Sequence, residues 1–389
     1  MLLYGRGVMD ELTIFKKALA DEEKFRVFLS YSHEDVELVV TLDRILRENG
    51  FDPMWDRHFA SGHGFRDQIR NFIAHAHVFI PVLTPKADER KWVHQEIGYA
   101  MAMNVPVLPI AVTSADEKAL PGELIQHLHA IRIGFSEPLS RSISEADQAR
   151  LKELLAHDPI ELLIARSVER DSVLFTCADF HENRAAMLAQ YADDVRALGR
   201  YGLVRQKGAL SSFHIPTQNI HHRVWLERYG GKDRGEEHCR LQRRERIALT
   251  RHAKAIGCKL IIDPSLDYGQ WGAGARRVRL RCLLEFLENM PDDHCQVAIH
   301  IGAEQGVNYT YVGNWFAAES KTVVLGKGYY QTIFTRHASS VGERIADFDN
   351  EFEALLDGAK IEPAQSREHA IAVLRREIAG NLATDAARA

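Results

Sequence analysis

Apolar and polar positions alternate in a regular way between residues 25 and 135. Short runs rich in β-branched and aromatic residues predict strands at 25–30, 51–55, 78–83, 105–112 and, more weakly, 131–135. Helical spacing of apolar residues separates them, as over 35–49, where Gly50 is placed to end the helix. Strands that are apolar on both faces are typical of a parallel sheet covered by helices, so this region predicts an α/β fold.

The second half of the chain shows a similar but less regular alternation. Strands are predicted at 173–176, 259–262, 296–301, 309–312 and 322–325, and helices at 181–198, 240–256 and 341–355. The expected organisation is an N-terminal helical extension over 1–23, an α/β domain over 24–137, a helical connector over 138–170, a second α/β domain over 171–358, and a helical or frayed tail over 359–389.

Composition limits the classes of protein that this chain can be. A net charge of −5 argues against binding nucleic acid over the whole surface, although a local basic patch remains compatible with it. The five cysteines all lie in the second half without a Cys-x-x-Cys pair, which favours free thiols in a reducing compartment. No apolar run reaches the length of a membrane span, and no signal-peptide core is present near the start. We therefore expect a cytoplasmic protein without membrane contact.

The segment Trp92-Val93-His94-Gln95-Glu96 has the strongest chemical pattern in the chain. It opens a predicted helix just after the buried strand at 78–83, and Trp92 and Glu96 lie one turn apart on one face. Ligands of open parallel sheets bind beyond the carboxyl ends of the strands, so this pair is placed near a predicted crevice. The alternative is a buried Trp beside a surface Glu that favours the helix N-terminus.

Residues 24 to about 135 resemble a Toll/interleukin-1 receptor (TIR) domain. The resemblance rests on Phe28-Leu29-Ser30-Tyr31-Ser32, Gly50-Phe51, Trp55-Asp56, Gly62 and Trp92-Val93-His94-Gln95-Glu96. It implies a flavodoxin-like parallel sheet, with residues 56–64 as the BB loop of the family. Many prokaryotic TIR domains cleave NAD⁺ between nicotinamide and ribose, and the Glu of their Trp-x-x-x-Glu motif is catalytic, which implies that role for Glu96. Receptor and adaptor TIR domains, by contrast, act as assembly modules.

Six further residues lie near the predicted crevice and are candidates for contact with the substrate. These candidate substrate-binding residues are Trp92, Ser32, His33, Trp55, Asp56 and Gly62. Four of them have a structural alternative: Trp92 and Trp55 as packing anchors, Asp56 as a turn residue and His33 as an exposed residue at a helix start. Ser32 and His33 stand where an axonal member of the family has two arginines, so the residues that recognise the phosphates remain open.

One carboxylate is sufficient for the implied reaction. The nicotinamide of NAD⁺ already carries a positive charge and leaves as a neutral molecule, so little acid catalysis is needed. The transition state resembles an oxocarbenium ion on the ribose, as in sugar hydrolysis, and a carboxylate beside the ribose stabilises that charge. We therefore expect NAD⁺ as a substrate, no cofactor and no metal.

Arginines and glycines cluster in the second domain and predict loops that can bind an anion. Arg276 and Arg277, beside Gly272 and Gly274, are the candidates for such a ligand site, and solvated helix faces are the alternative. The end of this domain is faintly similar to phospholipase-D-like domains, but it lacks the His-x-Lys signature of their catalytic site. His238-Cys239 and His294-Cys295 lack the spacing of zinc ligands.

The resemblance implies an NAD⁺ hydrolase that releases ADP-ribose or a cyclic ADP-ribose and acts in anti-phage defence. We expect activation by homo-oligomerisation through the TIR and C-terminal domains, with a nucleotide or nucleic acid as a possible trigger. Two other classes remain open: a non-enzymatic TIR assembly adaptor, and a nucleic-acid-responsive partner of another defence protein. NAD⁺ cleavage distinguishes the first class from the second, and salt-dependent oligonucleotide binding tests the third.

Overall fold

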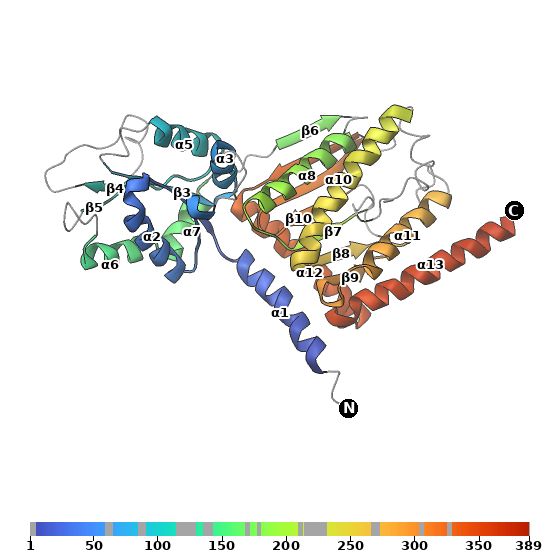
Figure 1. Ribbon diagram of the computed structural model, residues 1–389. Helices are drawn as coiled ribbons and strands as arrows, with labels where there is room; N and C mark the ends of the chain where they lie inside the picture. Colours follow the sequence, from blue (N-terminus) through green and yellow to red (C-terminus); the bar gives the residue numbers. More distant parts are fainter. Residues whose placement is uncertain are drawn as a thin grey trace.

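The computed structural model contains two α/β units, each built on its own sheet (Figure 1). It describes residues 5–58, 65–84, 91–113, 130–134, 143–167, 172–176, 180–208, 213, 232–265, 273–302, 307–324 and 329–388. The predicted fold class, a flavodoxin-like parallel sheet followed by a second α/β domain, is confirmed. Within the described ranges, no helix combines the length and apolar character needed to cross a membrane.

The first sheet has five parallel strands in the order β2-β1-β3-β4-β5. This is the strand order of flavodoxin-like folds, whose ligand site lies where the chain switches direction between the first and third strands. The strands are β1 (Arg26–Ser30), β2 (Asp52–Met54), β3 (Val78–Leu83), β4 (Ile110–Thr113) and β5 (Ile131–Gly134). The strand predicted over 105–112 is shorter than expected, because Pro106 and Pro109 interrupt its ladder and Val107 forms only an isolated bridge with Phe79.

Helices cover both faces of this sheet, since its strands are apolar on both sides. The helices are α2 (Val36–Glu48), α3 (Phe65–His75), α5 (Lys91–Ala102), α6 (Glu145–Leu154) and α7 (His157–Ala165), with the short 3₁₀ turns η1 (His33–Asp35) and η2 (Asp56–His58). α2, α6 and α7 share one core with β1 and β3, while α3 and α5 pack on the opposite face. Gly50 follows α2 with a φ of +87°, as its predicted role at the helix end requires.

The segment expected as a connector contributes to the first core. Leu151 and Leu155 at the end of α6 are fully buried against α2 and the sheet, and Ile160 and Ile164 of α7 join them. The structure therefore places α6 and α7 on the first sheet. The sequence predicts instead that this domain ends at residue 137. The apolar face of α6 was not recognised in the sequence, because polar residues separate its few buried leucines.

The second sheet has seven strands in the order β6-β12-β11-β10-β7-β8-β9. They are β6 (Ser172–Thr176), β7 (Val204–Lys207), β8 (Cys258–Ile262), β9 (Cys295–Ile299), β10 (Val307–Val312), β11 (Phe316–Val324) and β12 (Tyr329–Thr335). β7, β8 and β9 pair in parallel, and the remaining pairs are antiparallel. β7 and β12 were not predicted, and β11 is longer than the expected strand at 322–325.

The helices of the second domain lie on both faces of that sheet (Figure 1). They are α8 (Phe180–Ala197), α10 (Lys232–Ile256), α11 (Ala273–Glu288), α12 (Ala338–Ala359) and α13 (Ser366–Arg388), with the turns η7 (Asp292–His294) and η8 (Pro363–Gln365). α12 covers one face through Val341, Phe348 and Phe352, and the other four helices cover the opposite face. The C-terminal segment is a helix, and its Ala370, Ile371 and Leu374 belong to the core.

The N-terminal helix α1 (Gly5–Glu22) packs on the second domain, although it precedes the first domain in the sequence. Its Phe15 contacts the backbone turn at Gly257. Glu22, at the end of α1, binds the guanidinium of the fully buried Arg205 at 2.8 Å, and Asp349 of α12 binds the same guanidinium at 2.8 Å. An arginine with two carboxylate partners can be buried in a central strand, so this ion-pair network fixes α1 and α12 to β7.

The two domains share a continuous apolar core at their interface. Phe72 and Ile73 of α3 belong to the same buried cluster as Leu188 and Ala189 of α8. The side-chain amide of Asn71 also donates to the backbone carbonyl of Asp194 in α8, at 2.8 Å. The α3 face of the TIR-like sheet is therefore packed against the second domain.

A buried arginine forms a second part of this interface. Arg26, at the start of β1, donates to the backbone carbonyl of His75 and to the side chain and carbonyl of Asn314, and its guanidinium lies 3.8 Å from the ring centroid of Trp315. Burial lowers the pKa of Arg26 to about 9. These contacts hold the first strand of one domain against the β10–β11 turn of the other.

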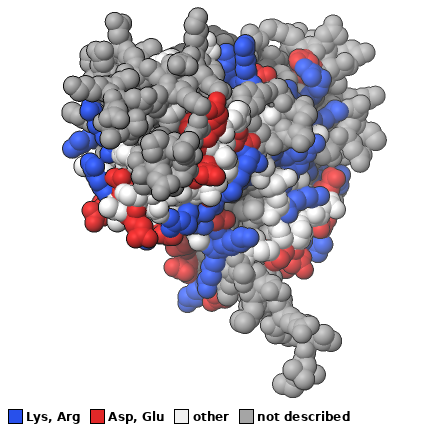
Figure 2. Space-filling model, turned by 60° about the vertical axis from the view of Figure 1, so that its left-hand side comes forward, with Lys and Arg blue, Asp and Glu red and all other residues white. Residues whose placement is uncertain are grey.

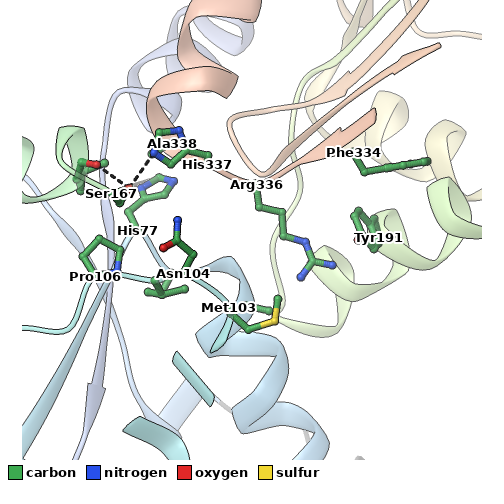
Figure 3. Close-up of a pocket in the computed structure, with 14 residues that line it drawn as sticks. His77, Met103, Asn104, Pro106, Ser167, Tyr191, Phe334, Arg336, His337 and Ala338 are labelled. Atoms are coloured by element: carbon green, nitrogen blue, oxygen red, sulfur yellow. Dashed lines mark hydrogen bonds between the residues drawn. The ribbon is translucent and has the colours of Figure 1, made fainter. Parts of the chain in front are cut away.

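A small cavity of about 90 Å³ also lies at this interface (Figure 3). The imidazole of His337 contacts the hydroxyl of Ser167 at 2.8 Å, and Arg336 stacks on the ring of Tyr191 at 4.0 Å. Residues from the first domain, including Asn104, close the other side. This volume holds a few water molecules and is too small for a nucleotide.

Candidate active site

Glu96 lies in the second turn of α5, at the edge of the first sheet. Val93, Ile97 and Ala100 are fully buried and hold the helix against the sheet, which fixes the position of Glu96 between them. The hydroxyl of Ser30, the last residue of β1, donates to Oε2 of Glu96 at 2.5 Å. Glu96 therefore lies past the carboxyl end of a central parallel strand, where ligands of this fold class bind.

The Glu96 carboxyl is only 8% exposed, and among the described residues no cation pairs with it to stabilise its charge. Burial raises its pKa to about 7, and the hydrogen bond from Ser30 opposes part of that shift. The group is therefore poised to exchange its proton near neutral pH. A pKa shifted by burial in a cavity is typical of functional carboxyls.

A cavity of about 710 Å³ opens beside Glu96. The described residues that line it come from three elements of the first domain: His33, Arg66, Ile69, Arg70, Ile73, Gln95, Glu96 and Tyr99. Its volume lies in the range of small-molecule and cofactor sites, and a dinucleotide fits that range. Its lining joins one carboxylate, two guanidiniums, an aromatic ring and two isoleucines.

His33 is the predicted substrate-binding residue that the structure brings together with Glu96 in this cavity. Its Nδ1 lies 3.1 Å from Oδ2 of Asp56, and the hydroxyl of Tyr31 donates to Oδ1 of the same carboxylate at 2.6 Å. Burial, with the neighbouring Asp56, raises the pKa of Tyr31, so the phenol remains a hydrogen-bond donor. Asp56 thus links the end of β2 to the loop after β1 and orients His33 at the cavity.

Ser32 and Trp55 are buried and are not among the lining residues. The indole of Trp55 donates to Asp43 of α2 at 2.9 Å, and Arg57 stacks on its ring at 4.3 Å. Ser32 is fully buried at the turn into η1. These contacts make Trp55 a packing anchor between β2 and α2, and its role in binding substrate remains a prediction.

Two further candidates fall partly or wholly outside the described structure. Trp92 lies in the first turn of α5, in the helix that was predicted for it, but its side chain is outside the described part. Gly62 lies outside the described residues altogether. Their roles in substrate binding remain predictions.

The sequence analysis missed several residues of this cavity. Arg66 and Arg70 lie four residues apart on α3, and Tyr99 and Gln95 flank Glu96 on α5. The i, i+4 spacing of the two arginines was a usable signal, because it places both on one face of a predicted helix. Ser30 was visible as the polar end of an apolar strand.

The arginine-rich segment of the second domain differs from the expected glycine loop. Arg276 and Arg277 lie on α11, so the loop prediction is wrong at these positions. The guanidinium of Arg276 binds the carboxylate of Glu377 in α13 at 2.5 Å and the backbone carbonyl of Pro264 at 2.7 Å. Arg276 therefore joins three elements of the domain, and an anion-binding role for Arg276 and Arg277 remains a prediction.

Metal-binding groups are sparse among the described residues. His157, Asp158 and Glu161 lie close enough together to bind an ion, and all three are exposed at the start of α7. Cys295 is buried on β9, where its sulfur lies 3.5 Å from that of Cys258 on β8. Neither group lies in the cavity beside Glu96.

The first domain is thus a flavodoxin-like α/β domain with a buried carboxyl at the ligand-binding edge of its sheet. Residues 27–155 match the family model of the TIR domain. This part of the chain is a TIR domain, as its resemblance in sequence implied, and the match includes α6, whose leucines complete the core. Comparison with curated proteins found no match to the chain.

Proposed function

We propose that the TIR domain hydrolyses NAD⁺ at the bond between nicotinamide and ribose, with Glu96 as the catalytic residue. The observation that carries this proposal is the position of Glu96: a nearly buried carboxyl, hydrogen-bonded to Ser30, at a cavity of about 710 Å³ in a TIR domain. The volume of the cavity lies in the range of nucleotide and cofactor sites, and Glu96 is the one carboxylate among its described lining residues, which matches a reaction that needs only one.

In the proposed reaction the bond between C1′ of the ribose and the nicotinamide nitrogen breaks. Its electron pair goes to the nitrogen, so the positively charged pyridinium leaves as neutral nicotinamide. Positive charge then develops on the ribose, and the Glu96 carboxylate stabilises it. A water molecule adds to C1′ and releases a proton, which yields ADP-ribose. If the adenine instead attacks C1′, the product is a cyclic ADP-ribose.

The environment of Glu96 suits this role. A carboxylate that is poorly solvated interacts strongly with a nearby positive charge, because little water screens the interaction. The bound substrate brings such a charge on its nicotinamide, which favours the ionised form of Glu96 and lowers its pKa in the complex. Ser30 holds the carboxylate in one orientation through its hydrogen bond, which is available before substrate binds.

The test is nicotinamide release from NAD⁺ by the purified full chain, followed by chromatography. Glu96→Gln keeps the size of the side chain and removes its charge, so we expect its turnover to fall by about 10²–10³-fold. Glu48→Gln is a matched control, since Glu48 is an exposed carboxylate on α2 that pairs with Arg44 and Lys152. Turnover of the Glu96 variant equal to that of the control would remove Glu96 from the reaction.

The proposal extends to assembly and biological role. We propose that the second domain promotes homo-oligomerisation, which raises the local concentration of TIR domains and activates cleavage in the cytoplasm during anti-phage defence. The described surface offers basic and acidic side chains interspersed on the face shown in Figure 2. If the wild-type chain releases no nicotinamide at any concentration, the TIR domain instead acts as an assembly module.

A further inference from the structure

We propose that Arg66 and Arg70 bind the diphosphate of the dinucleotide and make the site selective for substrates that carry it. This inference rests on the proposed function and assigns a substrate class to two residues of the same cavity. Both arginines line the cavity beside Glu96, and both are exposed on the same face of α3, four residues apart.

Among the described residues, neither guanidinium is committed to another group. In the part of the chain that the structure describes, Arg66 and Arg70 make no hydrogen bond and no ion pair. Other arginines of this domain are paired, as Arg47 is with Asp43 at 2.9 Å and Arg44 with Glu48 at 3.0 Å. Two uncommitted guanidiniums at the mouth of one cavity are available for an anionic ligand.

The packing of α3 fixes the face that carries these arginines. Ile69 and Ile73 contact the apolar core and also line the cavity, so they set the rotation of the helix. Arg66 and Arg70 then project one turn apart, with about 5–6 Å between their Cβ atoms. That spacing lets two guanidiniums share the oxygens of two linked phosphates, which arginine contacts in pairs.

The charges of the cavity support the same assignment. A diphosphate carries two negative charges, and Glu96 adds a third in its ionised form, so substrate binding requires compensating cations. His33 also lines the cavity, but its imidazole already contacts the carboxylate of Asp56 at 3.1 Å. Ser32, which precedes His33 in the loop after β1, is fully buried. Arg66 and Arg70 are the two described arginines that line this cavity.

The experiment compares three substrates that share the scissile bond and differ in phosphate. NAD⁺ carries a diphosphate, nicotinamide mononucleotide carries one phosphate, and nicotinamide riboside carries none. In the variant Arg66→Gln/Arg70→Gln, we expect kcat/KM for NAD⁺ to fall by about 10–100-fold through KM, while kcat/KM for nicotinamide riboside stays unchanged. The single variant Arg44→Gln serves as the surface control, because Arg44 is an exposed arginine on α2, away from the residues that line the cavity.

A binding measurement keeps this inference separate from the proposed reaction. Calorimetry with ADP-ribose, which has the diphosphate but no nicotinamide, should show a dissociation constant about 10–100-fold weaker in the double variant than in the wild type. If the wild type cleaves nothing but this loss is observed, the proposed reaction fails and the diphosphate site stands. Unchanged ADP-ribose binding in a folded double variant overturns the inference, as does an equal loss for NAD⁺ and nicotinamide riboside.

Discussion

At the scale of single residues, Glu96 combines a cost in stability with a capacity for chemistry. Its burial raises the pKa to about 7, which means that the folded protein disfavours the ionised form. The same weak solvation strengthens the interaction of the carboxylate with a cationic substrate. Active sites commonly contain groups whose functional form is unfavourable for the stability of the fold.

This conflict leads to a prediction for the stability of Glu96→Gln. Because the folded pKa lies above the ordinary value of 4.5, ionisation of Glu96 destabilises the protein as pH rises from 4.5 through 7. Replacement by glutamine removes that term, so we expect the variant to be more stable by about 3 kcal/mol at pH 8 and nearly equal to the wild type at pH 4.5. Thermal unfolding at both pH values measures this difference. A variant that is less stable at pH 8 would contradict the burial account of this pKa.

At the scale of secondary-structure elements, α3 connects the candidate site with the second domain. One face buries Phe72 and Ile73 in the shared core, and Asn71 bonds to the backbone of α8. The adjacent face presents Arg66 and Arg70 to the cavity. One helix therefore carries both the contacts with the second domain and the two arginines that line the cavity.

The central strands β1, β3 and β4 of the TIR domain could be predicted because each is largely a short apolar run that a serine or threonine closes. β7 of the second domain could not be predicted in this way, since Arg205 and Lys207 make a central strand polar. The explanation lies far away in the sequence: Glu22 and Asp349 neutralise Arg205, and Glu351 binds Lys207. The local sequence pattern around β7 carries no information about partners that lie so far away in the chain.

The candidate site was predictable to a similar degree. The sequence motif located Glu96 and the loop residue His33, which the structure places at one cavity. Trp55 was proposed for the same crevice; it is buried, its indole donates to Asp43, and it is not among the described residues that line the cavity. Arg66 and Arg70 were missed: their i, i+4 spacing places both on one face of α3, but only the tertiary packing shows that this face lines the cavity.

At the scale of the whole molecule, the two domains behave as one packed unit. The buried Arg26 joins β1 to Asn314 and Trp315, and Asp52 of β2 pairs with Arg200 of the second domain at 2.7 Å. The TIR domain therefore has one face covered by the second domain. This arrangement is compatible with control of the TIR site by association of whole chains.

Assembly gives a prediction for the dependence of activity on protein concentration. If TIR domains of neighbouring chains complete the site, the turnover of NAD⁺ per molecule should rise steeply with protein concentration and fall on dilution. Specific activity over a dilution series, with molecular mass measured by light scattering in parallel, provides the test. We propose that the loop over residues 56–64 contacts a neighbouring TIR domain, so Gly62→Pro should lower the activity without changing the mass. Full turnover by a strictly monomeric species would contradict the assembly proposal.

The most direct test of the Glu96 proposal is the pH dependence of kcat/KM for nicotinamide release, measured from pH 5.5 to 8.5. NAD⁺ does not change its charge at the reacting end in this range, so the profile reports the free enzyme. Because the reaction requires the carboxylate and the pKa is about 7, kcat/KM should rise about tenfold per pH unit on the acid side and level off above pH 7. Glu96→Gln should show a low and flat profile. A wild-type profile that is flat across pH 7, or a glutamine variant that follows the wild-type curve, would contradict the assignment of Glu96.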